Sequence, residues 1–332
     1  MKNIFTLVIV LFAFVSNAQR TMFGSQNNYV APTSSTPPST PPILSAPVIV
    51  TTAVTAITLT TATSGGTITS DGGSAITASG LVWGTSTNPT IALTTITNDG
   101  TSFGTFTSSM NGLCEGGTYY VRAYATNSIG TSYGSNITFT TSVAPAASVV
   151  IGSQTWMDKN LDVVAYQNGD LIPQVSDPTA WAALTTGAWC YYNNDPTTEA
   201  VYGKLYNWYA VNDPRGLAPQ GWHIPTNAEW TTLANTLGGA SIAGGKMKTP
   251  CTALWNSPNT GATGESGFKA RPSGFRYYQS SFLQQKTRAL WWTATQVDSA
   301  HAYYRYIYNN SGAFETSTEG KVDGFSVRVI AN

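Results

Sequence analysis

The most constraining feature of the sequence is the stretch 221–230, which reads Gly-Trp-His-Ile-Pro-Thr-Asn-Ala-Glu-Trp. Thr226 stands three residues before Glu229, and this is the spacing of a capping box, in which each side chain bonds the other residue's backbone N–H. The spacing predicts a helix that has Thr226 as its N-cap and ends near Leu237, before the glycine pair 238–239. We therefore expect a short, well-capped helix around which the C-terminal half is arranged.

The other side chains of this stretch are predicted to be structural. Trp222 and Trp230 are expected to lie buried against a sheet. His223 is expected to bond a backbone group, with a catalytic role as the less favoured alternative. Glu229 is an alternative general base, but its spacing from Thr226 favours the capping role.

The N-terminus carries a targeting pattern. Lys2 precedes a run over 4–15 that is apolar except for one threonine, and Ala18 ends a small-residue cleavage site. This pattern predicts a secretory signal peptide over residues 1–18, because the apolar run is too short to span a membrane. No later run is long enough, so the mature chain is expected to be secreted or to lie at the cell surface, with no transmembrane segment.

The length of 332 residues suggests about two domains. Residues 19–45 are rich in proline, serine and threonine and are predicted to form an extended linker. Residues 46–142 alternate apolar and polar side chains at 56–60 and 118–127, and turn residues lie between the short runs, so a β-sandwich is predicted. Trp83 is predicted to anchor its core.

Three motifs of this region resemble the fibronectin type III-like modules of secreted Bacteroidetes proteins. They are Ser-Gly-Gly-Thr-Ile-Thr-Ser-Asp-Gly-Gly at 64–73, Gly-Leu-Val-Trp-Gly-Thr-Ser at 80–86, and Tyr-Tyr-Val-Arg-Ala-Tyr-Ala-Thr-Asn-Ser-Ile-Gly at 119–130. Glu115 departs from the pattern, since that family often has proline there. The resemblance implies a spacer or adhesion module, although a fold alone does not settle a function.

The C-terminal half predicts a mixture of short elements. We expect a hairpin over 149–157 and helices at 181–184 and 203–211. Strands are predicted at 267–270, 290–295, 301–308 and 324–330. Trp291 and Trp292 are adjacent on one of these strands, so one is expected in the core and the other at the surface.

The motifs of residues 149–332 closely resemble the Fibrobacter succinogenes major paralogous domain, a module of secreted bacterial surface proteins. They include Tyr-Gly-Lys-Leu-Tyr-Asn-Trp-Tyr (202–209), the stretch 221–230, Gly-Phe-Lys-Ala-Arg-Pro-Ser-Gly-Phe-Arg (267–276), Trp-Trp-Thr-Ala-Thr (291–295) and Gly-Phe-Ser-Val-Arg (324–328). That family in turn is similar to the C-type-lectin-like superfamily. The resemblance implies an α+β domain with two helices, a small twisted antiparallel sheet, and long loops on one side.

Two positions depart from this family's pattern, in which a Cys-Pro pair often precedes the Gly-Trp-His motif and a cysteine often follows the last motif. This chain has Ala218 and Val329 there. The run Ile-Pro-Thr-Asn-Ala-Glu-Trp at 224–230 also resembles the helix start of formylglycine-generating enzymes, which use a reactive cysteine in their C-terminal part. The terminal strand here has no cysteine, so that chemistry is not expected.

Three cysteines are present, so at least one is free or pairs with another chain. Cys190 and Cys251 form a possible intradomain disulfide, but buried free thiols are the favoured expectation. The third is Cys114.

Other chemistry has few candidates. There are only two histidines, so no metal site is expected, and no phosphate loop or dinucleotide motif is present. We therefore expect no cofactor and no catalytic constellation. The net charge of zero and the charged fraction of 10% argue against a nucleic-acid binder, which needs basic surface.

Binding is the favoured class. In C-type-lectin-like folds, ligands meet the long loops around the later strands, which here implies 276–288 and 296–300. Exposed tyrosines suit recognition because each offers a rigid amphipathic face. The candidate ligand-binding residues are Tyr277, Tyr278, Gln284, Arg288 and Asp298.

The sequence thus favours a multidomain, non-catalytic binding or adhesion protein. In it, an all-β fibronectin type III-like sandwich at 46–142 displays an α+β C-type-lectin-like domain at 149–332. The expected partner is a glycan or a surface protein, possibly with copies of the chain itself. The alternatives are a structural subunit of a surface assembly and, less favoured, a glycan-processing enzyme.

Overall fold

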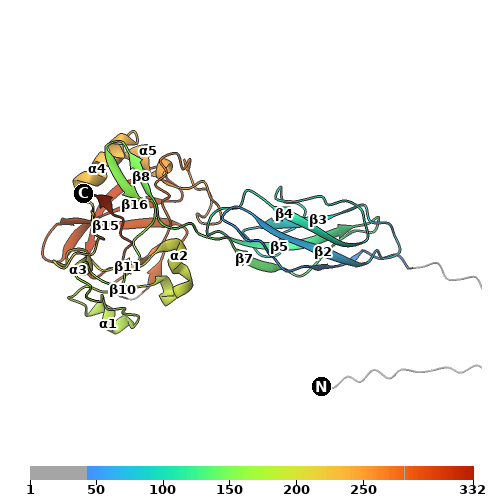
Figure 1. Ribbon diagram of the computed structural model, residues 1–332, viewed down its shortest axis with the longest axis horizontal. Helices are drawn as coiled ribbons and strands as arrows, with labels where there is room; N and C mark the ends of the chain where they lie inside the picture. Colours follow the sequence, from blue (N-terminus) through green and yellow to red (C-terminus); the bar gives the residue numbers. More distant parts are fainter. Residues whose placement is uncertain (1–42, 280) are drawn as a thin grey trace, which may run out of the picture. The chain divides into compact units, whose positions relative to one another are not determined.

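The computed structural model describes residues 43–279 and 281–332. The predicted signal peptide and residues 19–42 of the predicted linker lie outside the described residues. The described chain is mainly β-sheet, and its short helices all lie C-terminal to residue 177 (Figure 1). Among the described helices, none is long and apolar enough to cross a membrane.

Two antiparallel sheets form the N-terminal domain. One sheet contains β1 (Val48–Thr51), β2 (Ala62–Ser70) and β4 (Gly104–Met110), in that order. The other contains β3 (Ala78–Gly84) beside β5 (Thr118–Thr126), which also pairs with β6 (Thr131–Tyr133) and β7 (Ile137–Thr140). Inward-facing side chains of both sheets, including Ile68, Met110, Leu81 and Val121, meet in one buried core. The predicted sandwich-like arrangement of sheets is therefore present.

The alternation predicted at 118–127 is visible in the burial of β5. Tyr119, Val121 and Ala123 are buried, whereas Tyr120 and Arg122 are half-buried on the opposite face. Period-two alternation places one set of side chains in the core, so this strand was identifiable from sequence.

The strand predicted at 56–60 is wrong. The N–H of Thr61 donates to Oγ1 of Thr58 at 3.0 Å, which closes a turn, and Ala56 has a positive φ of 47°. Ile57 and Leu59 are exposed rather than buried. Local hydrogen bonding by threonine competes here with strand pairing, and β2 begins after the turn.

Two further antiparallel sheets form the C-terminal domain. The first has the order β12 (Trp222–His223), β18 (Ile330–Ala331), β9 (Gln154–Met157), β8 (Ser148–Ile151). The second consists of β15 (Arg288–Gln296), β16 (His301–Tyr308) and β17 (Glu315–Gly320). Two-strand ladders join β10 (Trp189–Cys190) to β11 (Leu205–Tyr206) and β13 (Phe275–Arg276) to β14 (Phe282–Leu283). The hairpin predicted at 149–157 is confirmed as β8 and β9, and pairing of β9 with β18 joins the two ends of the domain.

The longer helices are α4 (Asn227–Thr236) and α5 (Ala240–Met247), which contact each other, and α4 also contacts β15 and β16. The shorter ones are α1 (Pro178–Ala182), η1 (Tyr192–Asn194), η2 (Pro196–Thr198), α2 (Glu199–Tyr202) and α3 (Trp208–Val211). The helix predicted at 203–211 is therefore only partly present, because β11 occupies its first half. The helix predicted at 181–184 begins earlier, where Asp177 caps it by accepting from the N–H of Ala180 at 2.8 Å.

Two predicted strands at the end of the chain are mostly loop. Residues 267–270 form no strand, and Lys269 has a positive φ of 51°. Residues 324–329 make isolated bridges to three different segments instead of one ladder. The apolar pattern at both places reflects burial, which a loop in a domain core shares with a strand.

The expectation that only one of Trp291 and Trp292 is buried is wrong, since both are 0% exposed. Trp291 belongs to the core around Trp230, and Trp292 belongs to a second core around Phe325. Because β15 lies between two hydrophobic cores, both faces of the strand are covered.

Buried lysine and arginine side chains anchor the loops of the C-terminal domain. Lys248 is the fullest example, because its Nζ lies 2.8 Å from the carbonyl oxygen of Thr260 and 2.9 Å from those of Tyr308 and Ser311. Each buried cation of the described chain donates to at least one backbone carbonyl, a group that otherwise stays unsatisfied in a buried loop. They are Lys204, Lys248, Arg271, Arg276, Arg305, Lys321 and Arg328.

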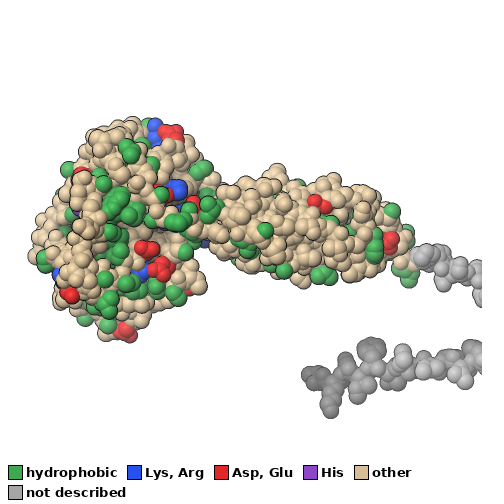
Figure 2. Space-filling view, viewed as in Figure 1, with side chains coloured by type: hydrophobic (Ala, Val, Ile, Leu, Met, Phe, Trp, Pro, Cys, Tyr) green, Lys and Arg blue, Asp and Glu red, His purple; other side chains and the backbone are tan. Residues whose placement is uncertain are grey.

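Charged side chains are correspondingly sparse on the surface. On the face shown in Figure 2, they form a few small groups, and uncharged side chains and backbone cover most of the molecule.

The possible disulfide between Cys190 and Cys251 is wrong, and the favoured expectation of buried free thiols holds for Cys190 but not for Cys251. Cys251 pairs with Cys114, at a Cα–Cα distance of 5.9 Å, and Cys190 is a buried free cysteine on β10. Cys114 follows β4 in the sandwich, so the bond joins the two domains. Sequence spacing carries no information about which loops of two domains meet.

Glu115 strengthens the same junction. Its Oε1 lies 3.4 Å from Nη2 of Arg271, whose side chain is 2% exposed, and its Oε2 lies 3.8 Å from Nζ of Lys269. Nearby, a Cβ on Gly117 would come within 2.9 Å of Cβ of Ala253. The two domains are therefore packed tightly where the disulfide crosses.

Candidate functional site

The stretch 221–230 forms a structural hub. Thr226 and Glu229 make the reciprocal capping box at the start of α4, with Oε2 of Glu229 accepting from the Thr226 N–H at 2.7 Å. Trp230 is fully buried, and its ring centroid lies 4.6 Å from that of Trp156. Trp222 is only half-buried, so it is less buried than expected.

His223 is bonded to side chains rather than to the predicted backbone group. Its Nε2 lies 2.8 Å from Oε1 of Glu229, and its Nδ1 lies 2.9 Å from Oδ1 of Asn332. Burial opposes ionisation of Glu229, but hydrogen bonds from Thr226 and His223 outweigh it and lower the pKa of Glu229. Through these bonds, His223 connects Glu229 in α4 to Asn332, which follows the C-terminal strand β18.

Tyr277 and Tyr278 lie in the turn between β13 and β14, with ring centroids 4.5 Å apart. Tyr278 is 41% exposed, and Tyr277 is half-buried. The hydrogen bond with Tyr278 raises the pKa of Tyr277, so this phenol is neutral at physiological pH. The N–H of Tyr277 donates to the carbonyl of Ser281 at 2.9 Å, and that of Tyr278 to Oδ1 of Asp323 at 2.7 Å. Backbone hydrogen bonds thus hold both tyrosines, whose rings lie side by side.

Asp323 is a buried carboxyl group, 0% exposed, that contacts this turn. Within the described residues, its Oδ2 has no hydrogen-bond partner. Burial raises the pKa of Asp323 to about 7, and the nearby carboxylate of Glu319 adds to the rise. The group is therefore partly protonated at neutral pH.

Replacing Asp323 with asparagine is expected to remove a pH-dependent loss of stability. A folded pKa above the unfolded value of 3.8 means that this carboxyl favours folding below about pH 4, and that the contribution falls as the pH rises to about 7. Between pH 5 and pH 8 the difference is about 2–3 kcal/mol. Urea titrations at both pH values should show a larger decline for the wild type than for D323N. Equal declines in the free energy of unfolding of the two proteins would contradict the prediction that burial raises the pKa of Asp323.

Arg288 and Gln284 belong to a different surface. The guanidinium of Arg288 lies 4.1 Å from the ring centroid of Tyr306 and 4.6 Å from that of Tyr308. Its Nη2 donates to the hydroxyl of Tyr304 at 3.2 Å, and its Nη1 to Oε1 of Gln284 at 3.3 Å. The charge of Arg288 is therefore already engaged by its own tyrosines.

Asp298 lies in the turn between β15 and β16. Its Oδ1 accepts from the N–H groups of Ala300 and His301, both at 2.7 Å. The hydrogen bonds from Ala300 and His301 lower the pKa of Asp298. Nζ of Lys321 donates to its carbonyl at 2.8 Å. Asp298 thus shapes its own turn.

The five predicted residues do not form one site. Arg288 is the first residue of β15 and Gln284 precedes that strand, whereas Asp298 follows its last residue. The tyrosine pair lies near the second end, because Asp323 contacts Tyr278 and the neighbouring Lys321 contacts Asp298. The candidates therefore fall into three groups, which are the tyrosine pair, Arg288 with Gln284, and Asp298.

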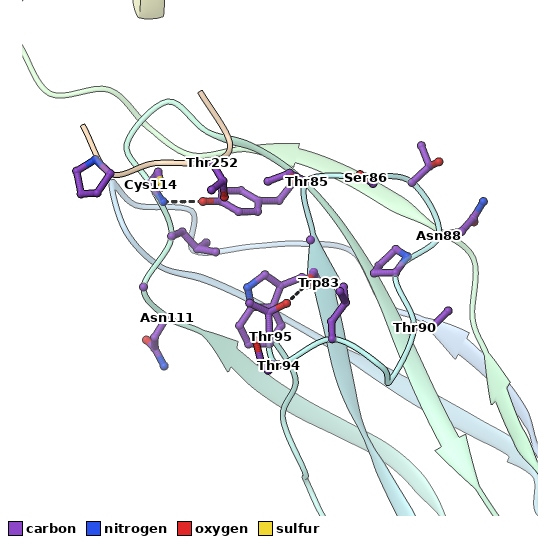
Figure 3. A pocket seen from close by; sticks show the side chains of 18 residues that line it. Trp83, Thr85, Ser86, Asn88, Thr90, Thr94, Thr95, Asn111, Cys114 and Thr252 are labelled. Atoms are coloured by element: carbon purple, nitrogen blue, oxygen red, sulfur yellow. Dashed lines mark hydrogen bonds between the residues drawn. The ribbon is translucent and has the colours of Figure 1, made fainter. Parts of the chain in front are cut away.

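A cavity of about 600 Å³ lies elsewhere, at the junction of the two domains. Figure 3 shows it between the loop that follows Trp83, the segment carrying Asn111 and Cys114, and the segment carrying Thr252. We did not predict a site here. The sequence feature that could have indicated it is the run of threonine, serine and asparagine at 85–90. Such a run is equally typical of an ordinary surface loop.

Cys190 is a poor candidate for a catalytic nucleophile. Burial raises the pKa of the Cys190 thiol to about 11 although Arg276 lies beside it, so the reactive thiolate is scarce. Within residues 43–279 and 281–332, no three histidine, cysteine or acidic side chains come together as metal ligands.

Comparisons with solved structures and with protein families cover different shares of the chain. The sensor domain of an anti-sigma factor from Pseudobacteroides cellulosolvens is similar at 18% identity, over 30% of this chain and 98% of that chain, with a TM-score of 0.23. A solution structure of that sensor domain gives 22% identity, over 32% and 83% of the two chains, and a TM-score of 0.23. TM-scores this low do not establish a shared fold or function.

Curated proteins gave no match to the chain. The model of the Fibrobacter succinogenes major domain matches residues 149–331, which is more than half of the sequence. The chain belongs to the Fibrobacter succinogenes major domain family.

Proposed function

We propose that this chain is an exported, non-catalytic recognition protein of the cell surface or the extracellular medium. In it, a C-type-lectin-like domain over 149–332 binds a glycan or a surface protein, and a fibronectin type III-like module over 46–142 carries that domain. The observation that supports the proposal most is the tyrosine pair of the β13–β14 turn. Neighbouring tyrosines supply large amphipathic contact area with little loss of conformational entropy.

The backbone that carries the pair is held from within the domain. The N–H of Arg276 donates to the carbonyl of Gly324 at 2.9 Å, and its guanidinium donates to the carbonyls of Val175, Ser176 and Asp177. With Asp323 bonding Tyr278 as well, both sides of the turn are anchored. A turn already ordered before binding loses less entropy when a ligand is bound.

Replacing Tyr277 and Tyr278 together with alanine is expected to weaken binding at least tenfold. The measurement is a glycan and surface-protein array with the mature chain, followed by titration of each ligand found. The matched control is Q284N at the other end of β15, where asparagine tolerates the positive φ of 61°. If Q284N weakens binding and the tyrosine variant does not, the contact surface is the one around Arg288. If neither does, the loop assignment is wrong.

A structural subunit of a surface assembly is the second candidate, and one observation favours it. β8 is the edge strand of its sheet, and Val150 on it is 70% exposed, which suits pairing with another chain. Mass measurement in solution separates the candidates, since a stable monomer argues against assembly.

A further inference from the structure

We infer that the cavity at the domain junction is a binding site for a short neutral saccharide, distinct from the tyrosine turn. Its volume of about 600 Å³ falls within the range of small-molecule sites, about 300–1,000 Å³. The inference goes beyond the proposed function, because the site lies partly on the sandwich and uses none of the loop residues.

Three segments form the walls, and two of them come from the sandwich (Figure 3). One is the loop after β3 that carries Thr85 to Thr90, and another is the segment after β4 that carries Asn111. The third wall, with Pro250 and Thr252, belongs to the C-terminal domain. The disulfide between Cys114 and Cys251 joins this wall to the sandwich, so the chain is tested in its oxidised form.

The walls carry no charge. None of the lining residues is a lysine, arginine, histidine, aspartate or glutamate. An ionic ligand would lose hydration without gaining a partner of opposite charge, at a cost of several kcal/mol. The site therefore selects against phosphates, carboxylates and cations.

The walls also disfavour a purely apolar ligand, because they are rich in hydroxyl and amide groups. In the part of the chain that the structure describes, the side chains of Thr85, Asn88, Asn111 and Thr252 make no hydrogen bond within the protein. An asparagine amide both donates and accepts, which matches the hydroxyl groups of a sugar.

Aromatic side chains complete the lining. Trp83 and Tyr119 are each 7% exposed, and hydrogen bonds hold the backbone of Trp83 and the ring of Tyr119 (Figure 3 draws the bond of Trp83). The Thr95 hydroxyl donates to the carbonyl of Trp83, and the N–H of Cys114 donates to the Tyr119 hydroxyl at 2.8 Å. Ring surface beside free hydroxyls and amides fits a polyol, whose C–H groups pack while its hydroxyls bond.

The test is titration calorimetry of the mature, oxidised chain with neutral gluco-, manno-, xylo- and galacto-oligosaccharides of two to four units. Acidic oligogalacturonides serve as the charged counterpart. We expect at least one neutral oligosaccharide to bind and the acidic ones to bind at least tenfold more weakly. Absence of binding by every neutral probe, or a preference for the acidic ones, would overturn the inference.

Two variants locate the site. S86W places a bulky ring in the cavity from an exposed loop position and should weaken binding at least tenfold. S102W is its matched control, because Ser102 is also exposed and lies near Gly100, which bridges to the opposite end of β3. N111L keeps the volume but removes the amide, and it should also weaken binding. Unchanged binding in S86W and N111L, with thermal unfolding as the folding check, would place the ligand elsewhere.

The tyrosine variant of the β13–β14 turn distinguishes this site from the proposed one. If it leaves oligosaccharide binding unchanged while S86W abolishes it, the cavity binds independently. If the tyrosine variant alone abolishes it, the loop site is supported and the cavity is not.

Discussion

Replacing Cys114 and Cys251 with serine is expected to lower the free energy of unfolding by about 3–5 kcal/mol. The bond closes a loop with a sequence separation of 137, and loop-closure entropy assigns about 5 kcal/mol to a loop of that length. Leu113 and Tyr119 on one side pack in the same hydrophobic cluster as Cys251 and Leu254 on the other, so the bond restrains one continuous core. Loss of the bond should therefore loosen both domains together.

Guanidinium titration followed by tryptophan fluorescence measures this effect. Dithiothreitol should shift the wild type toward the C114S/C251S midpoint and leave the double variant unchanged, which separates loss of the bond from effects of serine. A wild type that is insensitive to the reductant would contradict the prediction. We also expect protease to cleave the reduced chain in the segment 143–147, which lies between β7 and β8.

Replacing Lys248 with methionine is expected to cost about 3–6 kcal/mol. The side chain is 0% exposed, and its ammonium group is held by carbonyl oxygens of the 260 and 308–311 segments. Burial lowers the pKa of Lys248 to about 8, so the group remains mostly charged at neutral pH. Methionine fills the same channel but leaves those carbonyls unsatisfied, at about 1–3 kcal/mol each.

The matched control lies two residues away. Lys246 pairs with Glu265 at 2.9 Å, but the side chains are 33% and 53% exposed, so K246M should cost less than about 1 kcal/mol. Similar losses from K246M and K248M in denaturant titrations would show that the carbonyl cage does not stabilise the fold.

Local signals in the sequence predicted local structure well. The spacing of Thr226 and Glu229 placed the start of α4, and the alternation around Val121 placed β5. The glycine-serine turn between β8 and β9 likewise marked a hairpin. In each case the residues that form the sequence pattern are only a few positions apart, and the interactions that produce the structure are between those same residues.

Features that depend on distant segments were not predictable in the same way. Trp291 and Trp292 are both buried because separate cores cover the two faces of β15. The residues of those cores are distant in the sequence, so the residues next to the two tryptophans do not reveal them. The partner of Cys251 depends on how two domains meet. The sequence-predicted ligand residues shared a region of the chain, but the length of β15 separates Arg288 from Asp298. The junction cavity draws its walls from segments more than 150 positions apart in the sequence, with Trp83 the first and Thr252 the last of its lining residues.

The buried cations have a consequence for how this domain tolerates change. Each of them donates to at least one backbone carbonyl, and every residue has such a carbonyl, whatever its side chain. The loop residue that accepts from Lys248 or Arg276 can therefore be exchanged without removing the bond. Loop shape is thereby separated from loop sequence, so the outer surface of the domain is free to diversify while a few internal lysines and arginines preserve its form.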